Sequence, residues 1–350
     1  MRILWIESTM PGEAVRLSGS KMGRLAELVQ TGSNVPRAFA VTVEAFRDQM
    51  TTTGLDTLID AEVASLDPED SAAVEAAGDR IRGAIVTTPL LEAIEADIIE
   101  SYEELSDRCS DLNVPTAVRS SATGEDGNDS SFAGIFDTFL GVAGADNVVD
   151  AVRGCWASLF SPRAVAYRAQ RGISHHDMPM AVGVVELVQA RASGVAFSIH
   201  PVTGKSDRIV IEANWGFGEA VVQGLVTPDN FEVGKADMRI LRGTINDKTV
   251  VSAFDFAVGR VSETAMPDRL RRRACLDEEQ VAAVASAVLG IERHYDYPVD
   301  VEWVLDRHRQ PGGPISIVQS RPITVVEAQK PSVPYDPMAL ATKYLFAKGT

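Results

Sequence analysis

The chain has 350 residues, of which 45% are hydrophobic and 23% are charged, ordinary values for a globular protein with a sizeable core. Its 33 basic and 49 acidic residues give a net charge of −16, which disfavours non-specific binding to nucleic acid or to anionic lipid. Cys109, Cys155 and Cys275 match no metal or redox spacing. No apolar run approaches the roughly 18 residues of a membrane span, and the start lacks a signal-peptide pattern. We therefore expect a cytoplasmic protein.

The front of the sequence is dominated by helical periodicity. Alanine, leucine, glutamate and isoleucine recur at helical spacing from about residue 43 to residue 105, which predicts several helices. The other elements predicted in this part are a strand at residues 1–6, a helix at 20–29, strands at 38–41 and 116–121, and a helix at 146–170.

The back of the sequence changes to strand-like patterns. Strands are predicted at residues 180–188, 194–197, 208–213, 230–233, 239–242, 299–305 and 315–318, with a helix at 277–294 and a turn at 214–218. This change predicts an α+β fold of two lobes, with a helix-rich lobe at residues 1–190 and a strand-rich lobe at 191–328. Residues 329–350 are proline-rich and then apolar, which suggests a linker or docking tail.

The segment of residues 118–142 is too rich in small, polar side chains to build a core. Arg119 ends a strand-like run and precedes Ser120 and Ser121. A fixed guanidinium beside hydroxyls and backbone N–H groups suits a phosphate. The alternative is that Arg119 forms an ion pair with Glu125 or Asp126.

Three further positions could contact the same anion. Gly134 permits a close backbone approach and Thr138 offers a hydroxyl, although both also fit simple turn chemistry. Lys21 follows Gly19 and Ser20 at the predicted start of a helix, where a lysine can reach an anion at the helix N-terminus. The alternative for Lys21 is a solvated surface position.

Two strand-like segments near the end of the sequence carry polar groups among apolar neighbours. Period-two alternation places Asp300, Glu302 and Val304 on one face, and it places Gln319 and Arg321 together as well. Buried carboxylates are rare unless they are paired or bound to metal. The two readings are a metal site and a buried salt bridge between Glu302 and Arg321. Together with the first lobe, these groups predict a nucleotide triphosphate and its metal between two halves of the chain.

Two other motifs are weaker evidence for a binding site. The adjacent His175 and His176 lack the HxxH and HExxH spacings of metal ligands and are interpreted as surface residues. Gly204-Lys205-Ser206 resembles the end of a P-loop, but the first glycine of that motif would fall at Ile199.

The chain resembles the N-terminal nucleotide-binding domain of the phosphoenolpyruvate synthase and pyruvate, phosphate dikinase family, which includes rifampin phosphotransferase. The matching stretches occur in family order and cover nearly the whole chain to about residue 326. They are GSKMGRLAEL (19–28), VPRAFAVT (35–42), AVRSSATGEDGNDSSFAGIFDTFLGV (117–142), WASLFSPRAVAYR (156–168), ASGVAFSIHPVTG (192–204), NWGFGEAVVQG (214–224), ERHYDYPVDVEWVLD (292–306) and QSRPIT (319–324).

This resemblance implies an ATP-grasp fold, in which two lobes clasp ATP and Mg²⁺. The residues that it implicates in cofactor binding are Lys21, Arg119, Gly134, Thr138, Val185, Glu186, Val188, Glu302, Gln319 and Arg321. Among them, Lys21, Arg119 and Arg321 would act on the phosphates during catalysis, and Glu302 and Gln319 would hold Mg²⁺. Val185 stands where the family usually has a glutamine that contacts adenine. Base recognition would then use backbone groups, or would discriminate ATP from GTP less well.

The resemblance also implies an activity. ATP would give its β,γ-diphosphoryl group to a histidine on a separate swivelling domain or subunit, leaving AMP and later phosphate, for phosphorylation of a small organic acceptor. The five histidines of this chain occur in no Gly-Thr-Ser-His-Ala-like loop, so a partner subunit or domain is expected, as in split systems such as phenylphosphate synthase. The alternatives are a self-contained ATP-dependent kinase or ligase and a non-catalytic nucleotide sensor.

Overall fold

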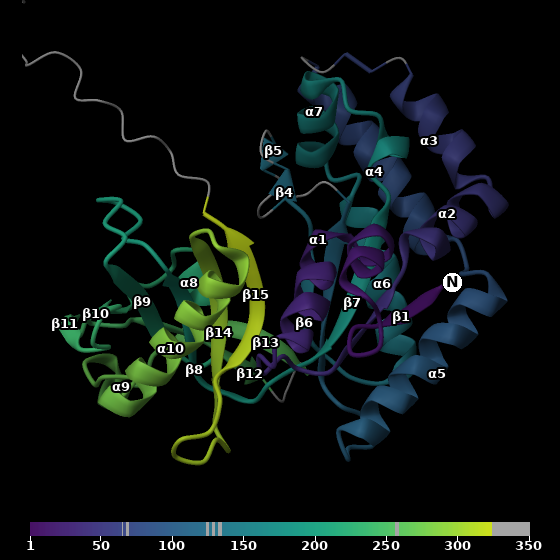
Figure 1. Ribbon diagram of the computed structural model, residues 1–350. Coiled ribbons are helices and arrows are strands. Elements are labelled where there is room, and N and C mark those ends of the chain that lie inside the picture. Colours follow the sequence, from purple (N-terminus) through teal and green to yellow (C-terminus); the bar gives the residue numbers. More distant parts are fainter. Residues whose placement is uncertain are drawn as a thin grey trace, which may run out of the picture.

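The computed structural model describes residues 1–64, 66–67, 70–123, 126–127, 130–131, 135–255 and 259–323. Two antiparallel sheets lie side by side, one in each half of the chain (Figure 1). The chain passes from the first sheet to the second between Glu186 and Ala190. Among the described helices, none combines the length and the apolar character needed to cross a membrane.

The first sheet has the strand order β1-β2-β7-β3-β6. Its strands are β1 (Ile3–Trp5), β2 (Ala38–Val41), β3 (Thr116–Ala122), β6 (Thr138–Val142) and β7 (Met180–Glu186). The helices around it are α1 (Pro11–Gln30), α2 (Val43–Thr52), α3 (Leu55–Val63), α4 (Ser71–Thr87), α5 (Glu92–Arg108), α6 (Ala145–Ser158) and α7 (Pro162–Arg171), and the short elements are β4 (Asp126–Gly127), β5 (Ser130–Ser131) and the 3₁₀ helix η1 (His175–Asp177).

Strand β2 shows how this sheet separates two cores. Its bulky Phe39 and Val41 face a large apolar cluster that α2 to α7 cover. Its small Ala38 and Ala40 face the opposite side, where α1 packs its apolar residues. Alternate residues of a strand point to opposite faces, so the Ala-Phe-Ala-Val sequence leaves room for α1 to lie close to the sheet.

The second sheet has the strand order β11-β10-β9-β8-β14-β15. Its strands are β8 (Ala190–Phe197), β9 (Arg208–Trp215), β10 (Asp229–Gly234), β11 (Ile240–Thr244), β14 (Val299–Asp306) and β15 (Ser316–Pro322). The other elements are α8 (Glu219–Val222), the hairpin of β12 (Val250–Asp255) and β13 (Arg260–Ala265), α9 (Asp268–Arg271) and α10 (Glu278–Tyr295). Helix α10 begins with a capping box of Asp277 and Gln280 and packs against one face of the sheet.

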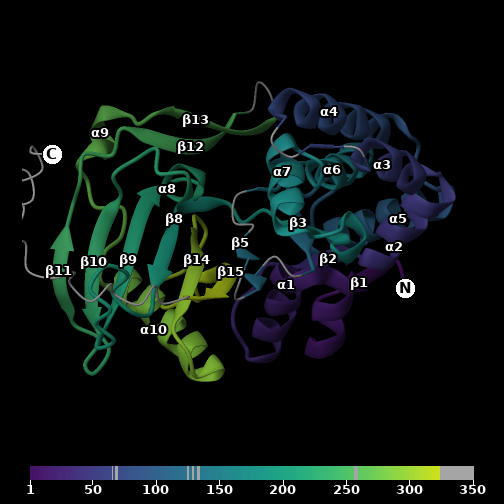
Figure 2. The same ribbon diagram turned by 90° about the horizontal axis from the view of Figure 1, so that it is seen from above.

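The two halves meet along α1 and β15. Ile317 N donates to Asn34 O at 2.8 Å, and Asn34 Nδ2 donates to the Ser316 hydroxyl at 3.0 Å. Near the end of α10, Tyr295 donates its hydroxyl hydrogen to Glu27 of α1 at 2.8 Å. On the other side, the β12–β13 hairpin reaches toward the first sheet (Figure 2), and β13 lies against β6.

One predicted helix needs correction. The helix predicted at residues 146–170 is two helices, because Ser161 caps a new helix that has Pro162 in its first turn. Proline has no N–H to donate and fits only the first turn of a helix. The helix predicted at residues 20–29 is confirmed as the part of α1 that follows a kink at Gly19, and the part of α1 before this kink was not predicted.

Gly19 is required at this kink by both its conformation and its surroundings. Its backbone has φ 74° and ψ 178°, a region that only glycine occupies readily. A Cβ atom at this position would lie 2.1 Å from the carbonyl oxygen of Ser121. The sharp bend therefore depends on a hydrogen in place of a side chain.

We expect Gly19→Ala to lower the free energy of unfolding by at least about 3 kcal/mol, which combines backbone strain with the clash against β3. Gly32→Ala is the matched control, since Gly32 also has positive φ (79°) but no described atom within 4 Å of the added Cβ. It should cost about 1–2 kcal/mol. Denaturant unfolding measures both values, and equal costs would show that contact with Ser121 is unimportant.

Candidate functional site

A cleft of about 680 Å³ lies between the two sheets. It gathers nearly all the residues that the sequence singles out. Those that line it are Lys21, Arg119, Thr138, Val185, Glu186, Val188, Glu302, Gln319 and Arg321. Gly134 lies outside the described residues. Groups from both ends of the chain thus face one space, with contributions from α1, β3, β6 and β7 on one side and β14 and β15 on the other.

Lys21 owes its position to the kink in α1. The Ser121 hydroxyl donates to Ser18 O at 2.6 Å and accepts from Met22 N at 3.2 Å, so β3 holds both sides of the break. The second part of α1 starts after Gly19, and Lys21 lies in its first turn. The N-terminal end of a helix favours negative charge. A lysine there adds to the attraction for an anion in the cleft.

Arg119 connects the two sheets through a chain of hydrogen bonds. Its Nη1 donates to Val318 O at 2.9 Å, and its Nη2 donates to Gln319 Oε1. Gln319 Nε2 in turn donates to Glu302 Oε1 at 2.9 Å. The alternative partners of Arg119, Glu125 and the side chain of Asp126, lie outside the described part. The guanidinium, the amide and the carboxylate therefore form one polar row across the cleft.

Arg321 is paired with Asp300 in the next row of the same hairpin. Arg321 Nε donates to Asp300 Oδ2 at 2.7 Å, and the strand register places these two residues opposite each other. The same register places Glu302 opposite Gln319. Glu302 and Arg321, the pair of the alternative salt bridge, therefore lie two positions apart in the register and not opposite each other. Arg321 remains 43% exposed, so part of its guanidinium still faces the cleft.

Glu219 is a cleft residue to which the sequence analysis gave no role. It begins the short helix α8, just after the turn at Gly216 to Gly218. Its Oε2 atom is buried and makes no hydrogen bond with the described residues. Burial raises the pKa of Glu219 to about 7, and repulsion from Glu302 and Glu263 adds to the effect. The motif NWGFGEAVVQG marked this loop, but a glutamate at a helix start is too common to stand out alone.

The loop of Glu219 is fastened to β12. Phe217 N donates to Ser252 O at 2.9 Å, and Ala220 N donates to the Ser252 hydroxyl at 3.0 Å. Asn214 Nδ2 donates to Val250 O at 2.9 Å. These bonds lie on both sides of Glu219 in the chain. The position of β12 therefore determines where the carboxylate of Glu219 lies.

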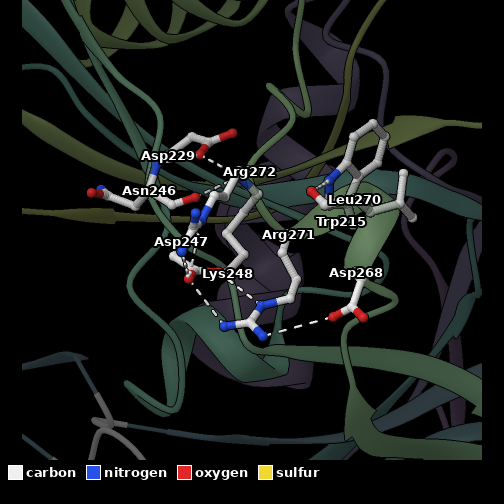
Figure 3. A network of polar contacts seen from close by, with 9 residues as sticks. All are labelled: Trp215, Asp229, Asn246, Asp247, Lys248, Asp268, Leu270, Arg271 and Arg272. Carbon is white, nitrogen blue, oxygen red and sulfur yellow. Dashed lines mark hydrogen bonds and ion pairs between the residues drawn. The ribbon is translucent and has the colours of Figure 1, made fainter.

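A polar network holds the segment that leads into β12 (Figure 3). Its centre is an ion pair between Lys248 and Asp229, whose side chains are fully buried and whose charged atoms are 2.5 Å apart. The Asp229 carboxylate also accepts hydrogen bonds from Asn246 N and Cys275 N, each at 3.0 Å. Farther out, Asp247 accepts from Arg271 and Arg272. Buried charges need such full pairing.

The two sheets and the cleft between them, lined by cations, carboxylates and an amide, define an α+β domain of the ATP-grasp type. Residues 15–340 match the family model described as the pyruvate phosphate dikinase, AMP/ATP-binding domain. The chain belongs to this family.

Curated relatives agree with the family match. The chain is 41% identical over 313 residues to a probable phosphoenolpyruvate synthase of Methanothermobacter thermautotrophicus, which covers 89% of this chain and 44% of the relative. It is 36% identical to the phosphoenolpyruvate synthase of Aeropyrum pernix, over 94% of this chain and 43% of the relative. It is 35% identical to the phosphoenolpyruvate synthase of Neisseria meningitidis, over 92% of this chain and 42% of the relative. The chain spans less than half the length of these relatives.

We expect the stability of the nucleotide-free, metal-free chain to depend on pH through Glu219. The ordinary pKa is 4.5 and the folded value is about 7, so the folded state keeps this proton to higher pH than the unfolded state. The free energy of unfolding should therefore fall as pH rises from about 4.5 to about 7. Glu219→Gln should remove that fall and be more stable than wild type at pH 8, by about 1–3 kcal/mol.

Glu103→Gln, which changes an exposed carboxylate on α5, is the control for Glu219. Denaturant unfolding at a series of pH values measures the slopes. A slope that is the same in wild type and in Glu219→Gln would contradict the burial of this charge.

We also expect Lys248→Met to destabilise the fold by about 3–5 kcal/mol, because it leaves the carboxylate of Asp229 buried without its cation. Arg272→Ala removes an exposed partner of Asp247 and should cost less than about 1 kcal/mol. The double change Asp229→Asn with Lys248→Met should recover part of the loss. Equal unfolding energies for Lys248→Met and Arg272→Ala would show that the buried pair does not hold this segment.

Proposed function

We propose that this chain is the ATP-binding component of a dikinase-type phosphotransferase. In this proposal the β,γ-diphosphoryl group of ATP passes to a histidine on a separate swivelling domain or subunit, and AMP is left in the cleft. The proposal rests on one observation: a single cleft between two sheets brings together cations and oxygen ligands that are far apart in the sequence. Residues 1–190 and 191–328 would act as the two lobes, and 329–350 as a linker or docking tail.

The cations of the cleft would bind the triphosphate. Lys21 approaches from α1, Arg119 from the first sheet and Arg321 from the second. Charge-assisted hydrogen bonds of this kind both hold phosphates and offset the charge that develops as a phosphoryl group is transferred. The hydroxyl of Thr138 would donate to the same oxygens, and Gly134, which lies outside the described residues, would allow a close backbone approach.

The donor set of the cleft fits magnesium. Glu302 and Gln319 supply carboxylate and amide oxygens, and Glu219 adds a buried carboxylate oxygen that lacks a partner among the described residues. Oxygen ligands of this type, together with phosphate oxygens, are those that Mg²⁺ prefers. When bound, Mg²⁺ would neutralise phosphate charge. We propose that Glu302 and Gln319 hold it, with Glu219 as a further ligand.

The segment from Val185 to Val188 would contact the base. The side chain of Val185 is apolar and nearly buried, and it packs with the cluster under α1. It cannot donate or accept a hydrogen bond, so the base would be read by backbone groups of this segment. Glu186 lies at the edge of the cleft, where its carboxylate accepts a hydrogen bond from Arg37 N at 3.3 Å.

The need for a second domain or subunit is supported by the relatives. The three relatives named above are more than twice as long as the matched region. All three are called phosphoenolpyruvate synthase or probable phosphoenolpyruvate synthase. We propose that the phosphohistidine and the site for a small organic acceptor lie on that additional part, and that the overall reaction is of the phosphoenolpyruvate synthase or pyruvate, phosphate dikinase type.

We expect Arg119→Ala to weaken the binding of magnesium-ATP by about 1.5–3 kcal/mol, the loss of a charged hydrogen bond. Lys21→Ala should weaken it as well. Arg80→Ala serves as the control, since Arg80 pairs with Glu62 on the surface. Titration calorimetry measures the three affinities. Unchanged affinity in both Arg119→Ala and Lys21→Ala would remove the phosphate assignment.

Analysis of nucleotide products tests the dikinase reaction itself. With magnesium and ATP, the chain alone should turn over slowly, and a partner that carries a swivel-type histidine should yield AMP and a phosphorylated partner. Rapid formation of ADP with a small acceptor, without a second polypeptide, would contradict the proposal and favour a self-contained kinase. Tight ATP binding without any turnover in the presence of the partner would favour a sensor.

A further inference from the structure

A second cluster of metal-ligating side chains lies away from the nucleotide cleft, in the first half of the chain. His175 and His176 form the 3₁₀ helix between α7 and β7, and Asp60 lies on α3. The Nε2 atoms of the two histidines are 3.2 and 3.0 Å from the same oxygen, Asp60 Oδ1. All the ligand atoms of this group lie within 4.8 Å of one another. Both histidines were predicted to be surface residues, because they lack the HxxH and HExxH spacings, and Asp60 is far away from them in the sequence.

The environment of His175 indicates that this is more than a surface ion pair. Its side chain is only 12% exposed. Its Nε2 atom is excluded from solvent and makes no hydrogen bond of acceptable geometry with the described residues, although Asp60 is close. The two imidazole rings are 4.0 Å apart between their centres. Two ring nitrogens thus converge on one carboxylate oxygen, and only His176 forms a hydrogen bond with it.

The charges around the cluster favour a neutral ring at His175. Burial lowers the pKa of His175, and His176 and Arg168 lower it further, while Asp60 and Asp56 act in the opposite direction. A neutral imidazole has a lone pair available for a metal ion, whereas a protonated one does not.

We propose that Asp60, His175 and His176 form a second metal site, which binds a divalent transition metal, with Zn²⁺ as the best fit. Two nitrogens and one carboxylate oxygen are typical ligands of zinc, and Mg²⁺ prefers oxygen alone. Ligand atoms about 2.0–2.2 Å from one tetrahedral zinc are about 3.3–3.5 Å apart. The two observed distances from histidine Nε2 to Asp60 Oδ1, 3.2 and 3.0 Å, would need to lengthen only slightly to reach this range.

The consequence of this site would be a cross-link within the first half of the chain. The metal would join α3 to the segment immediately before β7, the strand that carries Val185 and Glu186 to the cleft. Three protein ligands leave a fourth position for water. An ion that binds only the folded chain raises its stability, so the site would strengthen the attachment of this segment.

Zinc titration by calorimetry tests the site directly. The full chain is first treated with chelator and then kept nucleotide-free in excess Mg²⁺, so that the oxygen ligands of the cleft do not contribute. Wild type should bind one Zn²⁺, and its unfolding temperature should rise on binding. His175→Ala, His176→Ala and Asp60→Asn should each lower the zinc affinity at least tenfold and abolish the rise.

Two control variants distinguish zinc binding at this site from non-specific attraction of Zn²⁺ to other carboxylates and histidines. Asp56→Asn makes the same change one helical turn earlier on α3, and His308→Ala removes a histidine elsewhere. Both should keep wild-type zinc binding. Because Asp60 and His176 are more than half exposed, their variants should fold as wild type does. Unchanged zinc affinity in His176→Ala and Asp60→Asn would overturn the proposal, and so would an equal loss in Asp56→Asn and Asp60→Asn.

Discussion

The polar row from Arg119 through Gln319 to Glu302 is the interaction on which the geometry of the cleft depends. It begins on β3, crosses between the sheets and ends on β14. Each member limits its neighbour, since one orientation of the Gln319 amide lets Oε1 accept from the guanidinium and Nε2 donate to the carboxylate, whereas the flipped amide would lose both bonds. Together with the contacts of Asn34 and Glu27, the row therefore limits the distance between the two sheets, and it orients the groups that are proposed to meet phosphate and metal. A ligand that binds here must compete with these bonds or extend them.

The cleft also brings three cations together in an acidic protein, although carboxylates line it as well. The net charge is −16, yet Lys21, Arg119 and Arg321 face one space. Glu219 and Glu302 line the same cleft, where burial makes Glu219 costly to ionise and the charge of Glu302 adds to that cost. The repulsion between these carboxylates is unfavourable, and a cation bound between them, as proposed for Mg²⁺, would relieve it. Interactions away from the cleft, such as the buried ion pair of Lys248 and Asp229, hold the loop of Glu219 in place in spite of that cost.

Local patterns in the sequence predicted the α+β class and many strands, because alternation and helical spacing record which face of each element is buried. They placed Glu302 on one face of its strand with Asp300, and Gln319 with Arg321. They could not give the register between the strands, so the alternative salt bridge was drawn between Arg321 and Glu302, although Arg321 lies opposite Asp300. The hairpin of β12 and β13 was missed, and the break at Pro162 was overlooked. Asp60 and His176 meet only through the fold, 116 residues apart.

The most direct test of the central claim is a crystal structure of the chain with magnesium and a non-hydrolysable ATP analogue. The account predicts that the triphosphate lies between Lys21, Arg119 and Arg321, and that the metal is bound by Glu302 and Gln319. It also predicts that the base lies against the segment from Val185 to Val188. An analogue bound outside this cleft, or a triphosphate that contacts neither Lys21 nor Arg119 while Glu302 bears no metal, would contradict the account.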